Sequence, residues 1–152
     1  MSELDFKSPI DALSFAVFRA HAALIAAGDT LCAPYGMTSA RWQVLGALVL
    51  SPEPVTVAQV ARLLGLTRQA VQRVVNDLEQ AGAVTLEENP AHKRARFVVL
   101  TESGRQIYQA ITADWTKISE TLKAALSDTD LPGVIACLEG LKDELHRLSP
   151  PD

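Results

Sequence analysis

Side chains that can hydrogen-bond to DNA bases gather in one short segment of this 152-residue sequence, residues 67–80. Arg can donate two hydrogen bonds to guanine, and Gln or Asn can pair with adenine through both donor and acceptor. At helical spacing these side chains share one face. The segment therefore predicts a helix that reads a major groove through Arg68, Gln69, Gln72, Arg73 and Asn76, with Thr67 at its N-terminal end expected to bind a phosphate. Any one Arg or Gln has a simpler interpretation, as a good helix former on a solvated face.

A second basic cluster follows in a β-like region. Alternating residues at 84–87 and an apolar run at 97–100 flank a segment typical of a turn. This pattern predicts a β-hairpin whose tip carries Lys93, Arg94 and Arg96. We expect Arg94 to enter a minor groove, where negative potential concentrates. Arg96 is expected to contact phosphate or, alternatively, to pair with Glu87 across the hairpin.

The distribution of charge along the chain favours a nucleic-acid partner, whereas the net charge does not. The whole chain has a net charge of −4. Residues 62–105 nevertheless hold seven Lys or Arg side chains against five Asp or Glu, so this window is basic within an acidic protein. A protein of this kind can bind DNA through the window alone.

Sequence motifs for other chemistries are missing. The chain has no G-x-S-x-G, glycine-rich phosphate loop or H-E-x-x-H, and its three histidines fall in separate predicted elements. We therefore expect no catalytic residue, no metal and no cofactor. Cys32 and Cys137 are far apart and lack basic neighbours, so both are expected to be small buried residues. A cysteine-based redox sensor stays an alternative.

The composition is that of a globular domain, with 48% hydrophobic and 21% charged residues. No uninterrupted run of 18 apolar residues occurs, and the N-terminus lacks a basic region followed by an apolar core. From these features we expect a soluble, cytoplasmic protein without a membrane partner.

Six helices and the hairpin must position the candidate residues. Prolines, glycines and capping residues set the bounds of the helices. The expected helices cover residues 10–33, 39–50, 57–65, 68–81, 102–126 and about 128–148, and the expected caps are Thr38, Thr67, Thr101 and either Ser127 or Asp128. The helix over 68–81 should bury Ala70, Val71, Val74 and Leu78. The first helix has two apolar stripes, and the last has leucines at 3–4 spacing that require a partner helix.

Two short helices joined through Gly65–Thr67 and followed by a hairpin describe a winged helix-turn-helix. Together with the run Met-Thr-Ser-Ala-Arg-Trp-Gln-Val-Leu at 37–45 and the Leu-Thr-Glu-Ser-Gly that ends the wing at 100–104, this region resembles the MarR family of bacterial transcriptional regulators. The resemblance covers about residues 10–148. One position departs from the family's Asp-x-Arg wing motif: the Arg is kept as Arg94, but His92 replaces the Asp that helps to hold it in the family.

The resemblance implies a mostly α-helical protein with a small β-hairpin wing. Residues 37–101 would form the DNA-binding lobe, and residues 1–36 and 102–152 a helical dimerisation region. A homodimer would place two recognition helices about 34–36 Å apart on a pseudo-palindromic, double-stranded operator. The implied function is a sequence-specific transcriptional regulator, most commonly a repressor. The alternative is a winged helix that contacts only proteins.

MarR-like proteins commonly release DNA when a small, often aromatic or phenolic, effector binds between the dimer helices and the DNA-binding lobe. The resemblance places this effector among Arg19, His21, Tyr35, Arg41, Trp42 and Tyr108. His21 and Trp42 have a simpler alternative as structural residues, because a lone histidine or an inward tryptophan is more often part of the packing than of a ligand site.

Overall fold

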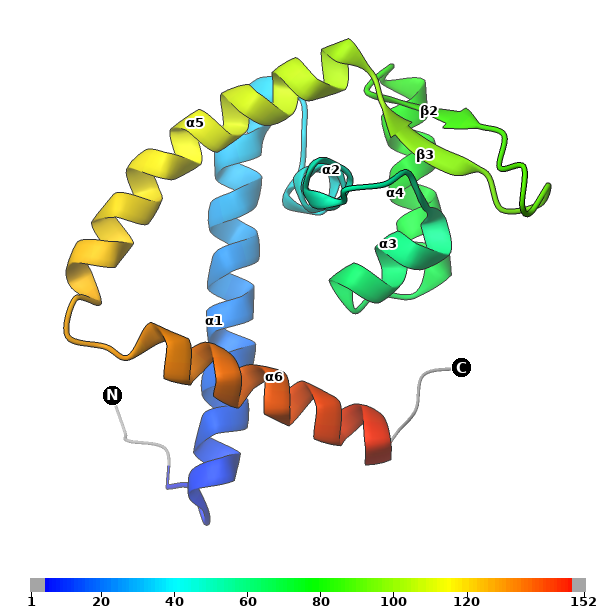
Figure 1. Ribbon diagram of the computed structural model, residues 1–152. Helices are drawn as coiled ribbons and strands as arrows, with labels where there is room; N and C mark the ends of the chain where they lie inside the picture. The colour runs from blue at the N-terminus through cyan, green and yellow to red at the C-terminus, as the bar shows by residue number, and fades with distance from the viewer. Residues whose placement is uncertain (1–4, 149–152) are drawn as a thin grey trace. The chain divides into compact units, whose positions relative to one another are not determined.

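The fold is mostly helical with one small antiparallel sheet, which confirms the predicted class. The computed structural model describes residues 5–148, so the outermost residues of the predicted dimerisation region lie outside the described residues. In chain order the elements are α1 (Pro9–Cys32), the 3-10 helix η1 (Ala33–Tyr35), α2 (Ser39–Leu50), β1 (Val55–Thr56), α3 (Val57–Leu64), α4 (Arg68–Gln80), β2 (Val84–Glu87), β3 (Phe97–Leu100), α5 (Glu102–Ala125) and α6 (Leu131–Leu148) (Figure 1). The chain forms two compact units, which divide between Thr116 and Lys117.

Local capping explains where the helices of the first unit begin. Thr38 accepts a hydrogen bond from the amide of Arg41 at the start of α2, and Thr67 accepts one from Ala70 at the start of α4. Thr56 and Gln59 form a reciprocal capping box at the start of α3. Gly65 ends α3 with a φ of 65°, a conformation that favours glycine. Both α2 and α4 begin as predicted, whereas the capping box was not anticipated.

The sheet has three strands in the order β1-β3-β2, one strand more than the two of the predicted hairpin. The hairpin itself is confirmed: Val84 pairs with Leu100 and Glu87 with Phe97 in antiparallel register. The extra strand, β1, is only Val55–Thr56 and pairs with β3 through Val98 and Phe97. A two-residue strand carries no alternation, so sequence periodicity cannot reveal it.

The hydrophobic core of the first unit is built around α2, α3, α4 and α5. Its largest fully buried side chains include Leu45, Val60, Leu78 and Ile111. On α4, Val71, Val75 and Leu78 are buried because their 4- and 3-residue spacing places them on one face. The predicted inward face of α4 was wrong for Ala70, which is exposed, and it omitted the fully buried Val75, while Val74 is half-buried and packs against the core.

The second unit contains α6, whose start differs from the prediction. Asp130, rather than Ser127 or Asp128, caps α6 by accepting a hydrogen bond from the amide of Gly133. The predicted leucine seam runs along α6, and all of its members except the half-buried Leu141 are exposed in the single chain, with Leu145 54% and Leu148 64% exposed. Cys137 is also exposed, so its predicted burial was wrong for the isolated chain.

Helix α1 presents an apolar surface to solvent in the single chain. Only Gly28 and Cys32 are buried, whereas Phe18 is 71% exposed. The segment Pro9–Tyr35 is long and apolar enough to cross a membrane by length and composition alone. The expectation drawn from uninterrupted apolar runs overlooked this property, because isolated polar residues such as Arg19 interrupt the runs. The signal is weak, since helices of soluble proteins pass the same test.

Candidate nucleic-acid interface

The polar face of α4 is fully presented to solvent. Thr67 and the side chains of Arg68, Gln69, Gln72, Arg73 and Asn76 are all exposed. The opposite face anchors the helix through Val71, Val75 and Leu78, which have no exposed surface. This division fixes the orientation of α4, so its Arg, Gln and Asn side chains point away from the core together.

Two of these side chains already pair along the helix. Gln72 donates from Nε2 to Oδ1 of Asn76 at 2.8 Å. The pair leaves Oε1 of Gln72 as an acceptor and Nδ2 of Asn76 as a donor. An adenine edge in the major groove requires one acceptor and one donor from the protein. The pair is therefore suited to read bases while holding both side chains in defined rotamers.

A cleft of about 390 Å³ joins α4 to the wing and to the start of α3. Of the residues predicted to contact DNA, the cleft brings together five. Its wall consists of Thr56, Val57, Ala58, Arg68, Gln69, Gln72, Leu86, Arg94, Ala95 and Arg96. Three guanidinium groups from two separate segments thus border one cavity, which makes it suited to an anionic partner. Thr67, Arg73, Asn76 and Lys93 are exposed but do not line it.

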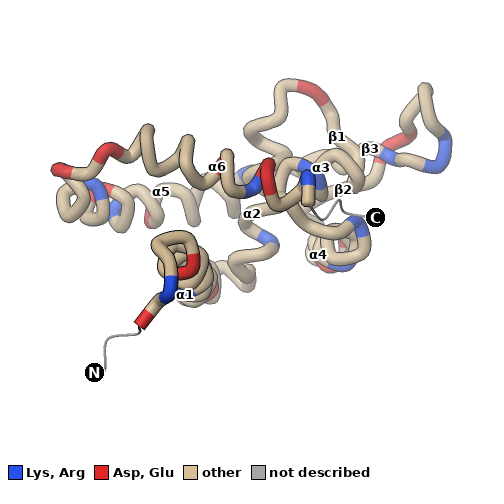
Figure 2. Tube along the Cα trace, turned by 90° about the horizontal axis from the view of Figure 1, so that it is seen from below, with Lys and Arg blue, Asp and Glu red and all other residues tan. Residues whose placement is uncertain are grey.

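The wing carries its cations at the tip of the hairpin, where Figure 2 shows a cluster of Lys and Arg. Lys93 and Arg94 are exposed there. Arg96 donates a hydrogen bond to the main-chain carbonyl of Leu86 across the hairpin. The predicted alternative partner, Glu87, is therefore replaced by the neighbouring carbonyl. This bond holds the guanidinium end of the Arg96 side chain against β2 and links the two sides of the hairpin near its tip.

Arg41, which was predicted to bind an effector, contacts α4 instead. Its guanidinium lies 3.1 Å from Oδ2 of Asp77 on α4 and donates a second hydrogen bond to the carbonyl of Gly36. Asp77 is the first acidic residue of the α4 face, and the pair neutralises it. The partners are 36 positions apart in the sequence, so no spacing pattern could have predicted their contact.

Three of the residues predicted to bind an effector belong to α5 or contact it. The hydroxyl of Tyr35 donates to Asp114 at 2.5 Å, and this hydrogen bond, with burial, raises the pKa of Tyr35. Trp42 packs edge-on against Trp115 with ring centroids 5.5 Å apart. Tyr108 lies against Gly46, where an added Cβ would be 3.4 Å from the ring. Arg19 and His21 are on exposed positions of α1. Sequence reasoning did not select Asp114 or Trp115.

Two polar atoms in the described chain are buried without a hydrogen-bond partner: Nε1 of Trp42 and Oγ1 of Thr112. A buried donor without an acceptor costs about 1–3 kcal/mol, so such atoms require an explanation. Both residues are only half-buried overall. Trp42 lies on α2 and Thr112 on α5, and α5 also carries Asp114 and Trp115, which contact Tyr35 and Trp42.

The thiol of Cys32 lies in an environment that disfavours its ionised form. Cys32 is completely buried, and both burial and the charge of Asp29 raise its pKa. A raised pKa keeps the thiol protonated and poorly reactive. Within residues 5–148, no three His, Cys, Asp or Glu side chains gather in a group that could hold a metal ion.

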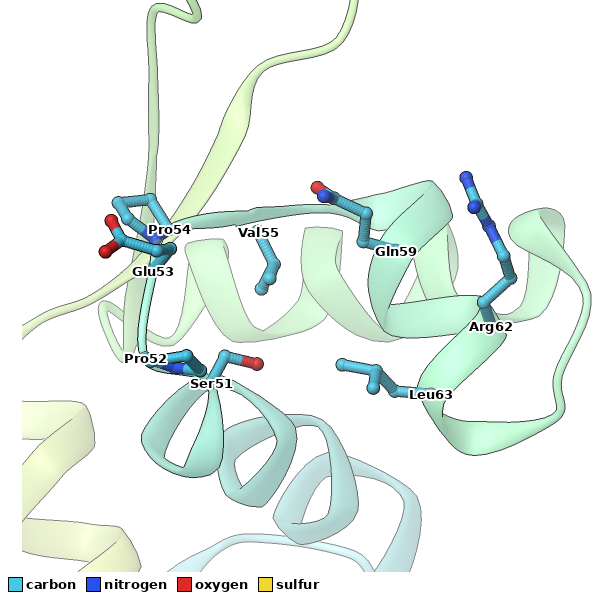
Figure 3. A pocket seen from close by; sticks show the side chains of 8 residues that line it. All are labelled: Ser51, Pro52, Glu53, Pro54, Val55, Gln59, Arg62 and Leu63. Atoms are coloured by element: carbon cyan, nitrogen blue, oxygen red, sulfur yellow. The ribbon is translucent and has the colours of Figure 1, made fainter.

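A second hollow, of about 420 Å³, lies between the end of α2, β1 and α3 (Figure 3). Val55 and Leu63 point toward it, as does the hydroxyl of Ser51, while the Arg62 side chain extends away. None of the residues predicted to contact DNA or an effector lines this hollow. A single arginine, Arg62, lines this hollow together with the acidic Glu53, whereas three arginines line the cleft between α4 and the wing.

Comparisons with known proteins agree with this geometry. The MarR family model matches residues 35–95, which span α2 through β2 and most of the loop at the tip of the wing. An uncharacterized protein of Mycobacterium tuberculosis (strain H37Rv) is 40% identical over 132 residues, which cover 87% of this chain and 86% of the relative. The matched family segment contains all of the candidate interface residues except Arg96, which follows it directly.

Solved structures extend the similarity to nearly the full chain. The crystal structure of the MarR family transcription regulator SP03579 is 25% identical, with a TM-score of 0.75 over 94% of this chain and 96% of that one. The M. tuberculosis regulator MosR in complex with DNA is 23% identical, with a TM-score of 0.76 over 90% and 97%. CouR of Rhodococcus jostii RHA1, bound to p-coumaroyl-CoA, is 21% identical, with a TM-score of 0.64 over 97% and 98%.

Proposed function

The chain belongs to the MarR family of transcriptional regulators, and from this premise we propose that it is a homodimeric repressor that a small molecule releases from its operator. In this proposal α4 enters the major groove and the wing enters the flanking minor groove. Residues 37–101 act as the DNA-binding lobe. The operator is a pseudo-palindrome, because two copies of one chain read it.

The cleft between α4 and the wing carries the proposal. Arg68, Gln69 and Gln72 border it from α4, and Arg94 and Arg96 border it from the wing. A protein that used this lobe only for protein contact would have no need to bring three guanidinium groups to one cavity. Phosphate and base edges are the partners that such a set of donors fits best. The solved complex of MosR with DNA supports the same use of the fold.

The exposed apolar faces of α1 and α6 support dimerisation. Phe18 is 71% exposed on α1, and Ile135 is 61% exposed on α6. Large apolar surfaces of this kind mark interaction sites, because leaving them in water is unfavourable. A second copy of the chain would cover them. Burial of α1 against a second copy also explains why Pro9–Tyr35 is apolar, with no need for a membrane.

The unpartnered Nε1 of Trp42 and Oγ1 of Thr112 support an effector with a hydrogen-bond acceptor. The Trp42–Trp115 pair favours an aromatic effector, and CouR offers a relative by fold that binds p-coumaroyl-CoA. Tyr35, Trp42 and Tyr108 are kept in the proposed site. Arg41 is engaged by Asp77, and Arg19 and His21 are exposed on α1, so we assign them no role there.

Effector binding can be followed by intrinsic fluorescence, because Trp42 and Trp115 are the only tryptophans of the chain. We expect an aromatic acid such as p-coumarate to change the emission with a saturable dependence on concentration and to weaken DNA binding. The Trp42→Phe variant replaces the indole with a smaller aromatic ring and removes the N–H. If p-coumarate and a panel of related phenols leave both emission and DNA affinity unchanged, the effector part of the proposal fails.

DNA binding is tested by fluorescence anisotropy on the DNA upstream of the protein's own gene and on a scrambled duplex, at several salt concentrations. We expect tight binding to the first duplex and a steep fall of log K with log salt. If both duplexes bind weakly and alike, selection from random duplexes decides between a distant operator and a lobe that contacts proteins. A selection that enriches no sequence overturns the proposal.

A further inference from the structure

The loop at the tip of the wing contains one buried polar side chain among exposed ones. Asn89 is 6% exposed, whereas His92, Lys93 and Arg94 in the same loop are exposed. Among the described residues only two other polar residues are buried, Ser39 and Thr56, and both lie at the start of a helix. A buried amide at the end of a hairpin requires partners within the loop itself.

Both ends of the Asn89 amide have such partners. Oδ1 accepts a hydrogen bond from the amide of Ala91 at 3.0 Å, and Nδ2 donates to the carbonyl of Ala95 at 3.0 Å. The main chain adds two further bonds: the amide of His92 donates to the Asn89 carbonyl, and the amide of Ala95 donates to the His92 carbonyl. Asn89 therefore closes a loop from residue 89 to residue 95, and Arg94 lies inside it.

Few other side chains can make this closure. One end must accept and the other must donate, which the amide group does without carrying charge. Aspartate would place a carboxylate oxygen against the Ala95 carbonyl, and serine is too short to bridge six positions while it accepts from Ala91. His92, at the position where related wings have Asp, takes part here through its main-chain groups.

We propose that Asn89 is the positioning residue of the wing, which holds the loop in the conformation that presents Arg94 to the minor groove. The proposal rests on the proposed function of Arg94 in DNA binding. Asn89 itself does not contact DNA, because its side chain is buried within the loop. An ordered loop loses less conformational entropy on binding than a mobile one, so the closure raises affinity without adding a contact.

A double-mutant cycle separates this role from a direct one. Operator affinity is measured for the wild type, Asn89→Ala, Arg94→Ala and the double variant. We expect Asn89→Ala to weaken binding about tenfold in the wild type. In the Arg94→Ala background the same change should have little further effect, because the residue acts through Arg94. Equal losses in the two backgrounds would overturn the proposal, as would no loss in either.

Amide hydrogen exchange tests the loop without DNA. In Asn89→Ala the amides of Ala91, His92 and Ala95 should lose protection, while Ala91→Ser, an exposed neutral change in the same loop, should leave them protected. Asn89→Ser keeps an acceptor for Ala91 and should lose protection chiefly at Ala95. Unchanged exchange in Asn89→Ala refutes the closure. Since this measurement needs no operator, it fails or succeeds independently of DNA binding.

Thermal unfolding followed by circular dichroism completes the test. We expect Asn89→Ala and Asn89→Ser to unfold within a few degrees of the wild type, because the loop lies outside the core. A large fall in the unfolding temperature of both variants would assign Asn89 to global stability and overturn its specific role in the wing.

Discussion

At the scale of single residues, the arginines of the candidate interface occupy two kinds of position. Arg94 lies on the wing and borders the cleft, whereas Arg73 is exposed on α4 outside the cleft. We expect Arg94→Ala to weaken operator binding by about 1–3 kcal/mol, because a group inserted in a groove is lost. Arg73→Ala should weaken all duplexes alike and reduce the salt slope by about one unit, because it removes one phosphate contact.

Anisotropy titrations on operator and scrambled duplexes, each at three or more salt concentrations, measure both effects. Lys123→Ala is a suitable control, because this exposed cation near the end of α5 lies outside the winged helix-turn-helix. Unchanged affinity in both arginine variants would contradict the docking of α4 and the wing. A uniform loss in Arg94→Ala would instead assign Arg94 to phosphate.

The buried thiol of Cys32 permits a prediction about pH. Burial and Asp29 raise the pKa of Cys32 above the usual 9.0, so in the folded protein the thiol stays protonated where the unfolded chain would ionise. The contribution of Cys32 to stability is therefore complete below pH 9 and falls as the pH rises further. In Cys137→Ser, where Cys32 is the only thiol, a thiol reagent at pH 8 should label the protein only after denaturant is added. Rapid labelling of the folded variant would contradict this expectation.

At the scale of elements, the parts with strong local signals could be predicted from the sequence. Thr38 and Thr67 cap α2 and α4 as expected, because a hydroxyl before a helix satisfies an amide of its first turn. The turn at Gly65 and the β2–β3 hairpin follow from local patterns in the same way. These features need only neighbouring residues, so the sequence contains all the information for them.

Elements that depend on distant contacts were missed or misplaced. Strand β1 exists because β3 offers it partners, and the Arg41–Asp77 ion pair forms because α2 packs against α4. The predicted inward face of α4 omitted Val75, since Val74 and Val75 are adjacent valines and only packing decides how deeply each is buried. At the start of α6, Ser127, Asp128 and Asp130 are all good caps, and the choice depends on the preceding turn.

The junction of α5 with β2 gives a prediction at this scale. A Cβ added at Gly104 would lie 2.0 Å from the carbonyl oxygen of Ala83, whereas one added at Gly140 would meet nothing within 4 Å. We expect Gly104→Ala to lower the free energy of unfolding by about 1–3 kcal/mol or more, because the backbone must shift. Gly140→Ala should raise it by up to about 1 kcal/mol, because alanine favours a helix. Urea denaturation measures both, and equal stability of the two variants would refute the close approach.

At the scale of the whole molecule, charge and apolar surface are divided between different parts of the chain. The excess of cations lies in residues 62–105, while residues 106–152 hold eight Asp or Glu against four Lys or Arg. The helix α6 in this acidic segment also exposes leucines that a monomer would leave in water. Acidic residues on the solvent side of a dimer helix would repel phosphate, so they restrict DNA to the basic lobe. In the proposed function, apolar association and DNA binding would therefore use separate surfaces.

This separation predicts that assembly can be removed without damage to the DNA-binding lobe. Phe18 is 71% exposed on α1, so Phe18→Glu should change the stability of a single chain little. If a second copy covers this face, the carboxylate becomes buried without a partner, and light scattering should show a monomer where the wild type is a dimer. Operator affinity should then fall steeply, because one chain reads only a half-site, while binding to an isolated half-site should persist. A variant that stays dimeric with wild-type affinity would place the interface elsewhere than on this face of α1.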